Sequence, residues 1–356
     1  MAILRLPGLI DPHVHLRDPG ATHKEDFDTG TAAALAGGFT CVLDMPNNSP
    51  PTTDAGALAD KRRRASSLAR CDYGFHVGAG AANVGKVHEL APEATGLKLY
   101  LDQTFGPLKL EGMQPILEHA ARWPEGSPIL CHGEGRSLAA AILATHLLGR
   151  ALHVCHVSSA EDIGLVRRAK DAGMRVTCEV APHHLFLHRG MISKLGEGRS
   201  EVRPRLGILD DCAALRESLD IVDCFATDHA PHTVAEKDSA KPPPGFPGLE
   251  TALPLYLRLV DEGLIDLDGL VARTSANARR IFGLPEQPET YVEIDVDRSW
   301  IARGEELHTR ARWTPFEGWS LKGRVERVVL RGEVAFADGR PLAPPGSGQD
   351  VRRRQS

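Results

Sequence analysis

Short apolar runs alternate with longer stretches of helical periodicity over the first 290 residues of the chain. Runs that fit buried strands cover eight segments: 9–16, 39–45, 72–78, 96–101, 128–133, 152–157, 175–180 and 223–228. Between several of them, apolar residues recur at helical spacing, as in 28–36, 114–122, 138–148 and 160–172. Buried strands that alternate with helices are typical of a parallel sheet, and eight of them favour a (β/α)8 barrel over an open sheet. The pattern therefore predicts an α/β protein with a TIM barrel over about residues 9–290.

The pattern changes after about residue 290. Residues 324–339, RVERVVLRGEVAFADG, fit two strands around a turn with no helix between them, and the N-terminal segment ILRLP is also strand-like. We therefore expect a small β appendage, a subdomain built from residues 1–8 and 291–345. Residues 346–356 are predicted to form a linker-like tail, because Gly, Ser and Arg dominate them.

Composition narrows the class of protein. The 356 residues are 42% hydrophobic, which is enough to bury a large core, and 42 basic against 47 acidic residues give a formal charge of −5. A protein that binds nucleic acids in general would carry a net positive charge, so the charge of this chain argues against that class. The seven cysteines form no CxxC pair, which favours a reducing compartment. No signal peptide and no apolar run of membrane-spanning length is recognisable. We expect a cytoplasmic protein without a nucleic-acid or membrane partner.

Imidazole and carboxylate groups stand at the predicted catalytic ends of several strands. His13 and His15 end the first strand, and alternate residues of a strand share a face, so both can bind one metal ion. His132, His156 and Asp228 end the fifth, sixth and eighth strands. A lone histidine at a strand end is usually structural, but packing alone does not explain so many at the catalytic end of one barrel. These residue types favour a divalent transition metal such as zinc.

Lys98, within the fourth predicted strand, needs a separate explanation. An ammonium group does not bind a metal ion, but burial in an apolar barrel favours the neutral amine. A neutral amine can add CO2 and form a carbamate, whose two oxygens can bridge two metal ions. A buried ion pair is the more common role for a lysine. The surrounding histidines and aspartate favour the carbamate here.

Several motifs resemble those of dihydroorotases, in the cyclic amidohydrolase branch of the amidohydrolase superfamily. They are DPHVHLRDPG, MPNN, GLKLYL, CEVAPHHLFL, ATDHAPH and KPPPGFPGLET. The HxH motif alone would be weak evidence for this family. The ordered series is specific evidence: HxHxR, the lysine, two further histidines and DHAPH. The resemblance runs from residue 6 to about 352 and is greatest to the dihydroorotase domain of CAD, the animal-type multifunctional pyrimidine-synthesis protein. It implies a homodimer, and fusion to carbamoyl-phosphate synthetase and aspartate transcarbamoylase domains.

The resemblance also implies a reaction and a metal centre. Two Zn²⁺ ions would be bridged by N6-carboxylated Lys98, and a hydroxide between them would attack the ring amide of L-dihydroorotate. Asp228 would be the general acid and base. The reverse reaction closes N-carbamoyl-L-aspartate into the ring in de novo pyrimidine (UMP) biosynthesis. The implied ligands are His13, His15, Asp228 and Lys98 for one ion, and His132, His156 and Lys98 for the other.

The substrate implied by the resemblance carries a carboxylate, and further residues can be assigned to binding it. Arg17 lies two residues past His15, hence on the same face, and can bind a carboxylate in a bidentate manner. Without the resemblance it would be interpreted as a surface arginine. Further contacts implied by the resemblance come from Asn47, Arg203, His232 and the backbone near Pro244 and Gly245.

The segment DQTFGPLKL (102–110) follows the fourth predicted strand and could form a lid. Thr104 would donate a hydrogen bond to the substrate, and Phe105 would exclude water. The alternative is an ordinary loop with an exposed phenylalanine. A third zinc ion between Cys155 and Glu179 also stays open, although we favour a buried thiol and a carboxylate that supports the ligands.

Other features receive plainer interpretations. We expect His153 to be a packing residue, and His183 and His184 to be supporting or loop residues. GAGAAN (78–83) lacks the third glycine of a nucleotide-binding motif and fits a turn. KRRRASS (61–67) resembles a kinase target, but a solvated basic helix face is favoured.

Two other functions compete with dihydroorotase. A hydantoinase, dihydropyrimidinase or allantoinase would share the metal core, but those substrates lack the ring carboxylate, so Arg17 and Asn47 favour dihydroorotase. An inactive scaffold domain would typically lose metal ligands, and all six positions are filled here.

Overall fold

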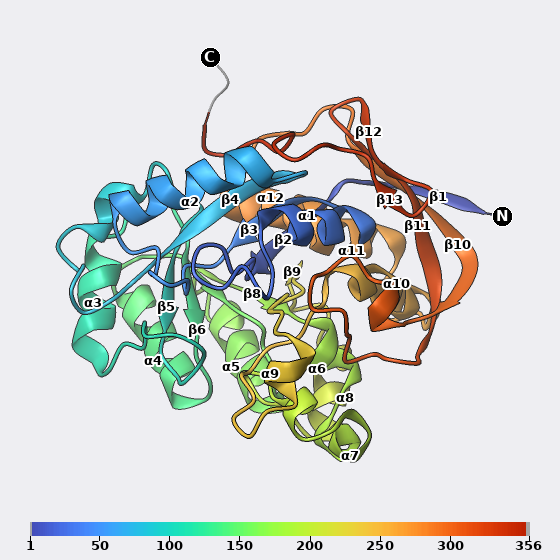
Figure 1. The fold of residues 1–356 in the computed structure, drawn as a ribbon. Coiled ribbons are helices and arrows are strands. Elements are labelled where there is room, and N and C mark those ends of the chain that lie inside the picture. Colours follow the sequence, from blue (N-terminus) through green and yellow to red (C-terminus); the bar gives the residue numbers. More distant parts are fainter. Residues whose placement is uncertain (1, 354–356) are drawn as a thin grey trace.

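A parallel barrel forms the centre of the molecule in the computed structural model, which describes residues 2–353. Eight parallel strands pair in sequence order from β2 to β9. A further parallel bridge joins Val14 to His229, so that the chain after β9 returns to β2 and nearly closes the sheet (Figure 1). The predicted TIM barrel is confirmed. Its strands are β2 (Leu9–Val14), β3 (Phe39–Asp44), β4 (Asp72–Gly78), β5 (Gly96–Tyr100), β6 (Ile129–His132), β7 (Leu152–Val154), β8 (Val176–Val180) and β9 (Cys224–Phe225).

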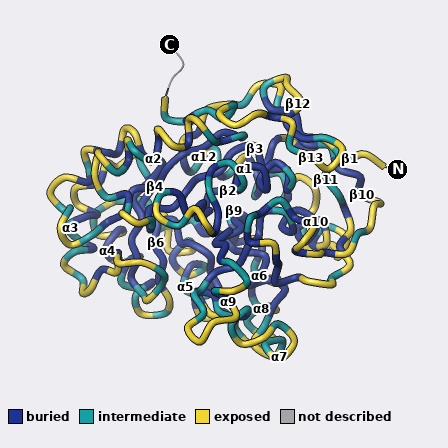
Figure 2. Tube along the Cα trace, viewed as in Figure 1, coloured by how far each residue is buried: buried dark blue, intermediate teal, exposed yellow. Residues whose placement is uncertain are grey.

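The barrel strands are buried on both faces. Every residue of β2 through β7 is buried, and Figure 2 shows this core surrounded by exposed helices and loops. Parallel strands covered on both sides read as continuous apolar runs. For that reason the hydrophobic pattern located all eight strands.

Helices connect the strands and cover the barrel. The four helical segments named from the sequence pattern correspond to α1, α3, α4 and α5, with ends shifted by at most two residues. The α-helices are α1 (Phe27–Ala36), α2 (Ala55–Leu68), α3 (Met113–Arg122), α4 (Arg136–Leu147), α5 (Ala160–Asp171), α6 (Pro182–Phe186), α7 (Ile192–Leu195), α8 (Leu209–Glu217), α9 (Val234–Lys237), α10 (Leu249–Asp261), α11 (Leu267–Val271) and α12 (Asn277–Phe282). Short 3-10 turns cover Val87–Leu90, Arg189–Met191, Gly198–Ser200 and Gly304–Glu306, and a π-helical turn covers Ala272–Ala276.

Both ends of the chain build the β appendage as a five-stranded antiparallel sheet, as predicted (Figure 1). The two strands expected in 324–339 are β11 and β12, and the N-terminal strand pairs with β10 in a register that places Leu4 opposite Ile294. Whether this sheet is a separate domain stays a prediction. Its strands are β1 (Ile3–Pro7), β10 (Tyr291–Ile301), β11 (Ser320–Leu330), β12 (Glu333–Ala337) and β13 (Arg340–Pro341).

The described part of the expected linker, residues 346–353, lies against the barrel. Asp350 forms a parallel bridge with Tyr73 of β4, and its carboxylate lies 2.5 Å from Nε of Arg62 on α2. The linker-like composition of 346–356 does not indicate these contacts, which arise because the buried guanidinium of Arg62 requires an anionic partner. The glycines and arginines of this segment do not indicate that requirement.

Two segments that we set aside as motifs adopt plain structures. The 78–83 segment is a turn in which the Asn83 side chain accepts a hydrogen bond from the Gly80 amide at 2.9 Å. The expected solvated face of KRRRASS is wrong for Lys61 and Arg62, which are buried. Lys61 forms a 2.7 Å ion pair with Asp44 and donates to the Met45 carbonyl and to Oδ1 of Asn48, and these contacts together compensate its burial.

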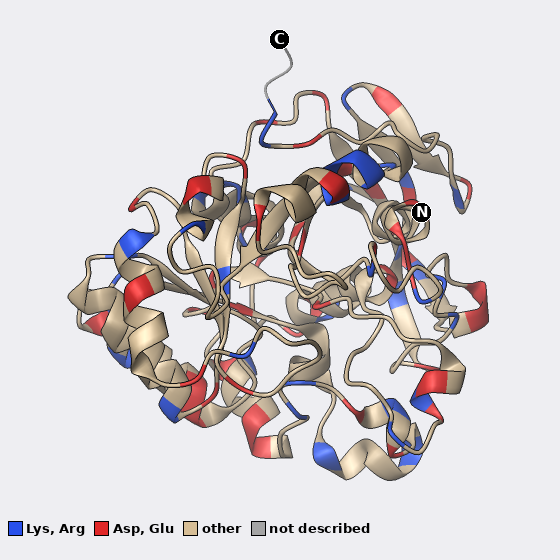
Figure 3. Cartoon of the chain, turned by 60° about the vertical axis from the view of Figure 1, so that its left-hand side comes forward, with Lys and Arg blue, Asp and Glu red and all other residues tan. Residues whose placement is uncertain are grey.

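Charges of both signs are interspersed along the outer helices (Figure 3). Among the described residues, no helix has the length and apolar character needed to cross a membrane. All seven cysteines are buried and free.

Candidate metal centre and active site

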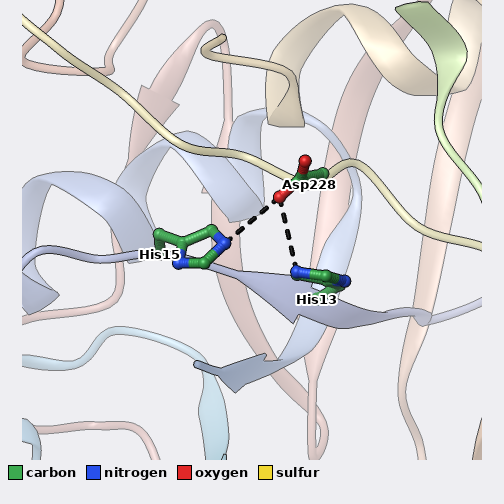
Figure 4. A group of neighbouring side chains, drawn as sticks. All are labelled: His13, His15 and Asp228. Carbon is green, nitrogen blue, oxygen red and sulfur yellow. Dashed lines mark hydrogen bonds and ion pairs between the residues drawn. The ribbon is translucent and has the colours of Figure 1, made fainter. Parts of the chain in front are cut away.

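The first predicted ligand group converges where β2 and β9 end. Oδ1 of Asp228 lies 3.4 Å from Nε2 of His13 and 3.2 Å from Nε2 of His15 (Figure 4). The ligand atoms of these three residues all lie within 4.8 Å of one another. One metal ion fits between two imidazoles and a carboxylate at this spacing.

The second predicted pair lies beside the first. Nδ1 of His132 is 2.9 Å from Nε2 of His156, and the rings of His156 and His13 are 5.1 Å apart. Nε2 of His132 and Nδ1 of His156 are buried without a hydrogen-bond partner among the described residues. Buried polar atoms are normally paired. Their lack of partners fits a role as metal ligands.

The electrostatics of the site keep the imidazoles neutral. Burial, with the charge of Lys98 adding to it, lowers the pKa of His13 far below its usual value and that of His132 to about 3. Burial and the neighbouring His132 likewise lower the pKa of His156. A neutral imidazole has the free lone pair that a metal ion needs. Burial raises the pKa of Asp228 to about 7, so this carboxyl can exchange a proton near neutral pH.

Lys98 is fully buried at the centre of the barrel. Its Nζ lies 2.8 Å from Sγ of Cys155 and 5.2 Å from the ring centre of Tyr100. The positive charge of Lys98 contributes to the lowered pKa of His13 in the first ligand group and of His132 in the second. The structure therefore places this amine close to both predicted ligand groups.

Glu179 on β8 supports the first group from behind. Its Oε1 lies 2.5 Å from Nδ1 of His13, and its Oε2 lies 3.0 Å from Nε2 of His153. His153 is therefore more than a packing residue, because it completes a buried chain through Glu179 to a predicted ligand. His13, Cys155 and Glu179 also form a second group with ligand spacing. A third ion there stays a prediction.

His183 and His184, which we expected to be supporting or loop residues, lie on the short helix α6. Both are buried, and Nε2 of His184 lies 3.2 Å from the Pro204 carbonyl oxygen.

Strained backbone marks the same end of the barrel. Arg17, His156 and Asp228 have φ values of 62°, 34° and 47°, a left-handed conformation that non-glycine residues rarely adopt. Such residues persist only where the surrounding structure holds them, and they cluster at functional sites. The strand ends are thus bent so that these side chains meet.

A small cavity of about 20 Å³ lies over the ligand groups. Nearly all predicted substrate contacts line it together with predicted ligands. His232 stands behind them, with Nε2 at 3.1 Å from Nη2 of Arg17 and 3.0 Å from the Pro244 carbonyl oxygen. The lining residues are His13, His15, Arg17, Asn47, Tyr100, Thr104, Phe105, His132, His156, Arg203, Asp228, Ala230, Pro244 and Gly245.

Phe105 separates this cavity from a wider outer cavity of about 430 Å³. The inner space holds about one water molecule, far less than a six-membered ring requires. The Arg17 guanidinium carbon lies 5.3 Å from the Phe105 ring centre, and Nζ of Lys24 lies 4.9 Å from it. We therefore expect the 102–110 loop to move when a ring substrate enters.

Several predicted contacts have protein partners. Asn47 holds a ligand and the loop together, because its Oδ1 lies 2.7 Å from Nδ1 of His15 and its Nδ2 donates to the Phe105 carbonyl at 2.9 Å. Arg203 forms a 2.7 Å ion pair with Glu201. A Cβ atom at Gly245, whose φ is +142°, would lie 2.4 Å from the Ala230 carbonyl oxygen, so the close approach requires glycine.

Sequence reasoning missed four residues at this site. Tyr100 has a buried hydroxyl without a partner among the described residues, and it could have been found because it lies two residues past Lys98 on one strand. Asp11, two residues before His13, accepts hydrogen bonds from the Thr227 amide and hydroxyl and so ties β9 to β2. Lys24 and Lys237 come from loops and a short helix, where no periodicity identifies them.

Lys237 shapes the wall of the cavity. Its Nζ donates to the carbonyls of Glu201, Pro243 and Gly245 at 2.7, 3.0 and 3.3 Å. Burial lowers the pKa of Lys237 to about 7.

Comparison with known proteins agrees with this geometry. The model of the amidohydrolase family matches residues 4–288. The chain is 52% identical over 350 residues to the multifunctional protein CAD of Squalus acanthias, covering 98% of this chain and 16% of that protein. It is 33% identical to the dihydroorotase of Pyrococcus furiosus, covering 98% of this chain and 85% of that enzyme. The resemblance drawn from the motifs is therefore confirmed.

Solved structures show the same fold. The L-hydantoinase (dihydropyrimidinase) from Arthrobacter aurescens superposes with a TM-score of 0.90 at 25% identity, over 98% of this chain and 89% of that one. The inactive dihydroorotase-like domain of the Chaetomium thermophilum CAD-like multifunctional protein superposes with a TM-score of 0.85 at 27% identity, over 99% of this chain and 100% of that domain. The family match, the relatives and the barrel with its convergent ligands agree, and the chain belongs to the amidohydrolase family.

Proposed function

We propose that the chain is a zinc-dependent dihydroorotase that interconverts N-carbamoyl-L-aspartate and L-dihydroorotate. Arg17 carries this proposal. Its guanidinium is buried in the cavity, where Nε donates to the Pro231 carbonyl oxygen and Nη2 lies 3.1 Å from the neutral ring of His232. A buried cation normally has an anionic partner. A ring carboxylate bound beside the ligand groups would supply one.

The predicted ligands fit a two-metal centre. Neutral imidazoles, two of them with unpartnered ring nitrogens among the described residues, and the Asp228 carboxylate surround the buried amine of Lys98. We propose that His13, His15 and Asp228 hold one Zn²⁺, that His132 and His156 hold the other, and that N6-carboxylated Lys98 bridges them. Bound divalent ions would lower the pKa of water and polarise the ring amide carbonyl.

The side chains divide the remaining work. Asp228, with its raised pKa, would accept a proton from the attacking water and deliver it to the ring nitrogen as the amide bond breaks. Arg17 and His232 would hold the carboxylate, and Arg203 with the backbone at Pro244 and Gly245 would contact the ring. Thr104 and Phe105 would close over the bound ring and exclude water.

Hydrolysis of L-dihydroorotate, followed by loss of ring absorbance, tests the proposal. The assay is run on the protein as purified, after chelator treatment and after return of zinc, with dihydrouracil and hydantoin as rings that lack the carboxylate. We expect turnover of L-dihydroorotate only, abolished by metal removal and restored by zinc. Turnover of the uncharged rings alone would contradict the proposal and identify another cyclic amidohydrolase.

Two alternatives rest on specific observations. The similarity to the Arthrobacter hydantoinase favours an uncharged ring, but the buried Arg17 would then have no anionic hydrogen-bond partner among the described residues. The similarity to an inactive dihydroorotase-like domain favours a scaffold, but the complete ligand set opposes it. Zinc binding without turnover of any ring would favour the scaffold.

We also propose a context for the chain. Because it spans 16% of the length of the Squalus CAD protein, we infer that it is the dihydroorotase part of a longer cytoplasmic protein with carbamoyl-phosphate synthetase and aspartate transcarbamoylase domains. A homodimer is expected. Sedimentation at micromolar concentration should give twice the mass of one chain, and a monomer would contradict the dimer.

A further inference from the structure

Lys24 is a buried lysine beside the predicted anion pocket for which neither the motifs nor the proposed reaction has a role. It lies in the segment between β2 and α1. Its Nζ is 3.0 Å from Nδ1 of His232 and 3.1 Å from Oε1 of Glu236 on α9. Two segments distant in sequence, 24 and 232–236, thus meet at this amine.

His232 carries a single ring proton. Burial, together with the cations Arg17 and Lys24, lowers the pKa of His232 far below its usual value, so that the imidazole is neutral. A neutral imidazole donates from one nitrogen and accepts at the other. The backbone is fixed as well, because Nε1 of Trp313 donates to the His232 carbonyl at 2.7 Å. In the observed ring orientation, the two neutral forms of His232 differ in which nitrogen carries the proton.

Lys24 decides between the two forms. An ammonium group only donates, so a hydrogen bond from Lys24 requires an unprotonated Nδ1 on His232 and places the proton on Nε2. Nε2 then donates to the Pro244 carbonyl, 3.0 Å away. The guanidinium of Arg17, 3.1 Å from Nε2, also only donates and by itself would favour the other tautomer. Burial lowers the pKa of Lys24, and the Glu236 carboxylate 3.1 Å away opposes that shift and favours the charged amine.

We propose that Lys24 is a positioning residue that places the His232 proton on Nε2, on the side of Arg17, and so tunes the pocket for a carboxylate. With the proton there, Nη2 of Arg17, 3.1 Å away, cannot donate to His232 and keeps its N–H for the substrate. Without Lys24, the proton can move to Nδ1. Nε2 would then accept from Arg17 and present a lone pair to the anion. This inference rests on the proposed function for its substrate, but not for the tautomer.

Lys24→Met tests the role, since it keeps the length of the side chain and removes its charge. We expect KM for L-dihydroorotate to rise about tenfold, as for the loss of one charge-assisted hydrogen bond, while kcat changes less than about twofold. Lys24→Arg retains a donor and should restore KM to within about threefold. Lys322→Met, at an exposed lysine paired with Asp261 far from the pocket, is the matched control and should leave both constants unchanged.

The decisive measurement is the nitrogen NMR spectrum of the zinc-loaded protein with 15N-labelled histidine. The His232 signals are identified by their loss in His232→Asn. We expect an unprotonated Nδ1 in the parent and a protonated Nδ1 in Lys24→Met, which a merely structural lysine would not cause. If Lys24→Met does not fold, Glu236→Gln should give a smaller change in the same direction.

An unchanged KM in Lys24→Met, or an unchanged His232 tautomer, would overturn the inference. Failure of the proposed function looks different. In that case the parent protein would not turn over L-dihydroorotate, while the tautomer of His232 would still depend on Lys24.

Discussion

Two regions of the barrel bury charged and polar side chains in opposite ways. At the site, His132 and His156 keep buried nitrogens without partners among the described residues, and Asp228 is held in a strained conformation. Along the outside, where α2 meets β4 and the C-terminal segment, Arg62 is buried against Asp350 at 2.5 Å. We call the second region the α2 seam, defined by Arg62, Glu93 and Asp350.

In these two regions, the partnered charges hold the fold together, and the nitrogens without a partner in residues 2–353 belong to residues predicted to bind metal ions. In the α2 seam each buried charge has its partner, so the pair holds the C-terminal segment to the barrel. At the site, the buried nitrogens without hydrogen-bond partners in the described part of the chain and the residues with strained backbone raise the free energy of the folded state, and packing elsewhere in the barrel must offset this cost. Loss of a site residue should therefore affect activity, and loss of a seam residue should affect stability.

Asp228→Asn at the site should have the largest effect of the changes considered, a loss of activity. The amide keeps the shape of the side chain but cannot accept and return a proton, so kcat for L-dihydroorotate hydrolysis should fall about 1,000-fold. The urea midpoint of the metal-free protein should not fall, because a buried carboxylate is removed. Asp220→Asn, at an exposed residue paired with Arg167, is the control and should leave kcat unchanged. Equal activities of the two variants would contradict the role of Asp228.

Arg62→Met should break the α2 seam. It leaves the Asp350 carboxylate buried without its cation, which should lower the free energy of unfolding by about 3 kcal/mol while kcat stays constant. Arg167→Met removes an exposed ion pair and should cost less than about 1 kcal/mol. Urea unfolding of both variants measures the contrast. Equal losses of unfolding free energy would show that the buried ion pair of the α2 seam stabilises the fold no more than an exposed one.

Lowering the pH should destabilise the metal-free protein through the buried histidines of the barrel. Burial lowers the pKa of His76 and of His132 from 6.5 to about 3, so below pH 6.5 the unfolded chain binds more protons than the folded one. Stability is therefore lost as the pH falls, by about 2 kcal/mol for each histidine at pH 5. Urea unfolding at pH 7.5 and pH 5 measures this loss. His76→Gln should show a smaller loss, and an identical pH dependence would rule out this histidine as a source.

The loop over the site should give the smallest effect. Phe105→Ala removes a ring that lies near two cations, and Thr104→Ala removes a hydroxyl, so each should lower kcat/KM about fivefold. Gln103→Ala, at an exposed position of the same loop, is the control. Unchanged kcat and KM in both Thr104→Ala and Phe105→Ala would contradict the lid.

The sequence by itself determined the barrel, its appendage and the residues that approach the site. Strands buried on both faces produce apolar runs, and side chains at their ends share one edge, so His13, His15 and Asp228 can be grouped from their places along the chain. The resemblance to dihydroorotases added the roles. These features are local, because each depends on residues within one strand or loop.

The tertiary structure alone decided the partners. Lys24 and His232 are 208 residues apart in sequence, Arg62 and Asp350 are 288 apart, and Glu179 supports His13 across 166. No periodicity links such residues, since the two members of each pair lie on different elements far apart in the sequence. A linker-like tail and a basic helix face therefore appeared solvated in the sequence but are partly buried in the fold. A buried charge needs a counter-charge close in space, and only the folded chain determines which residue supplies it.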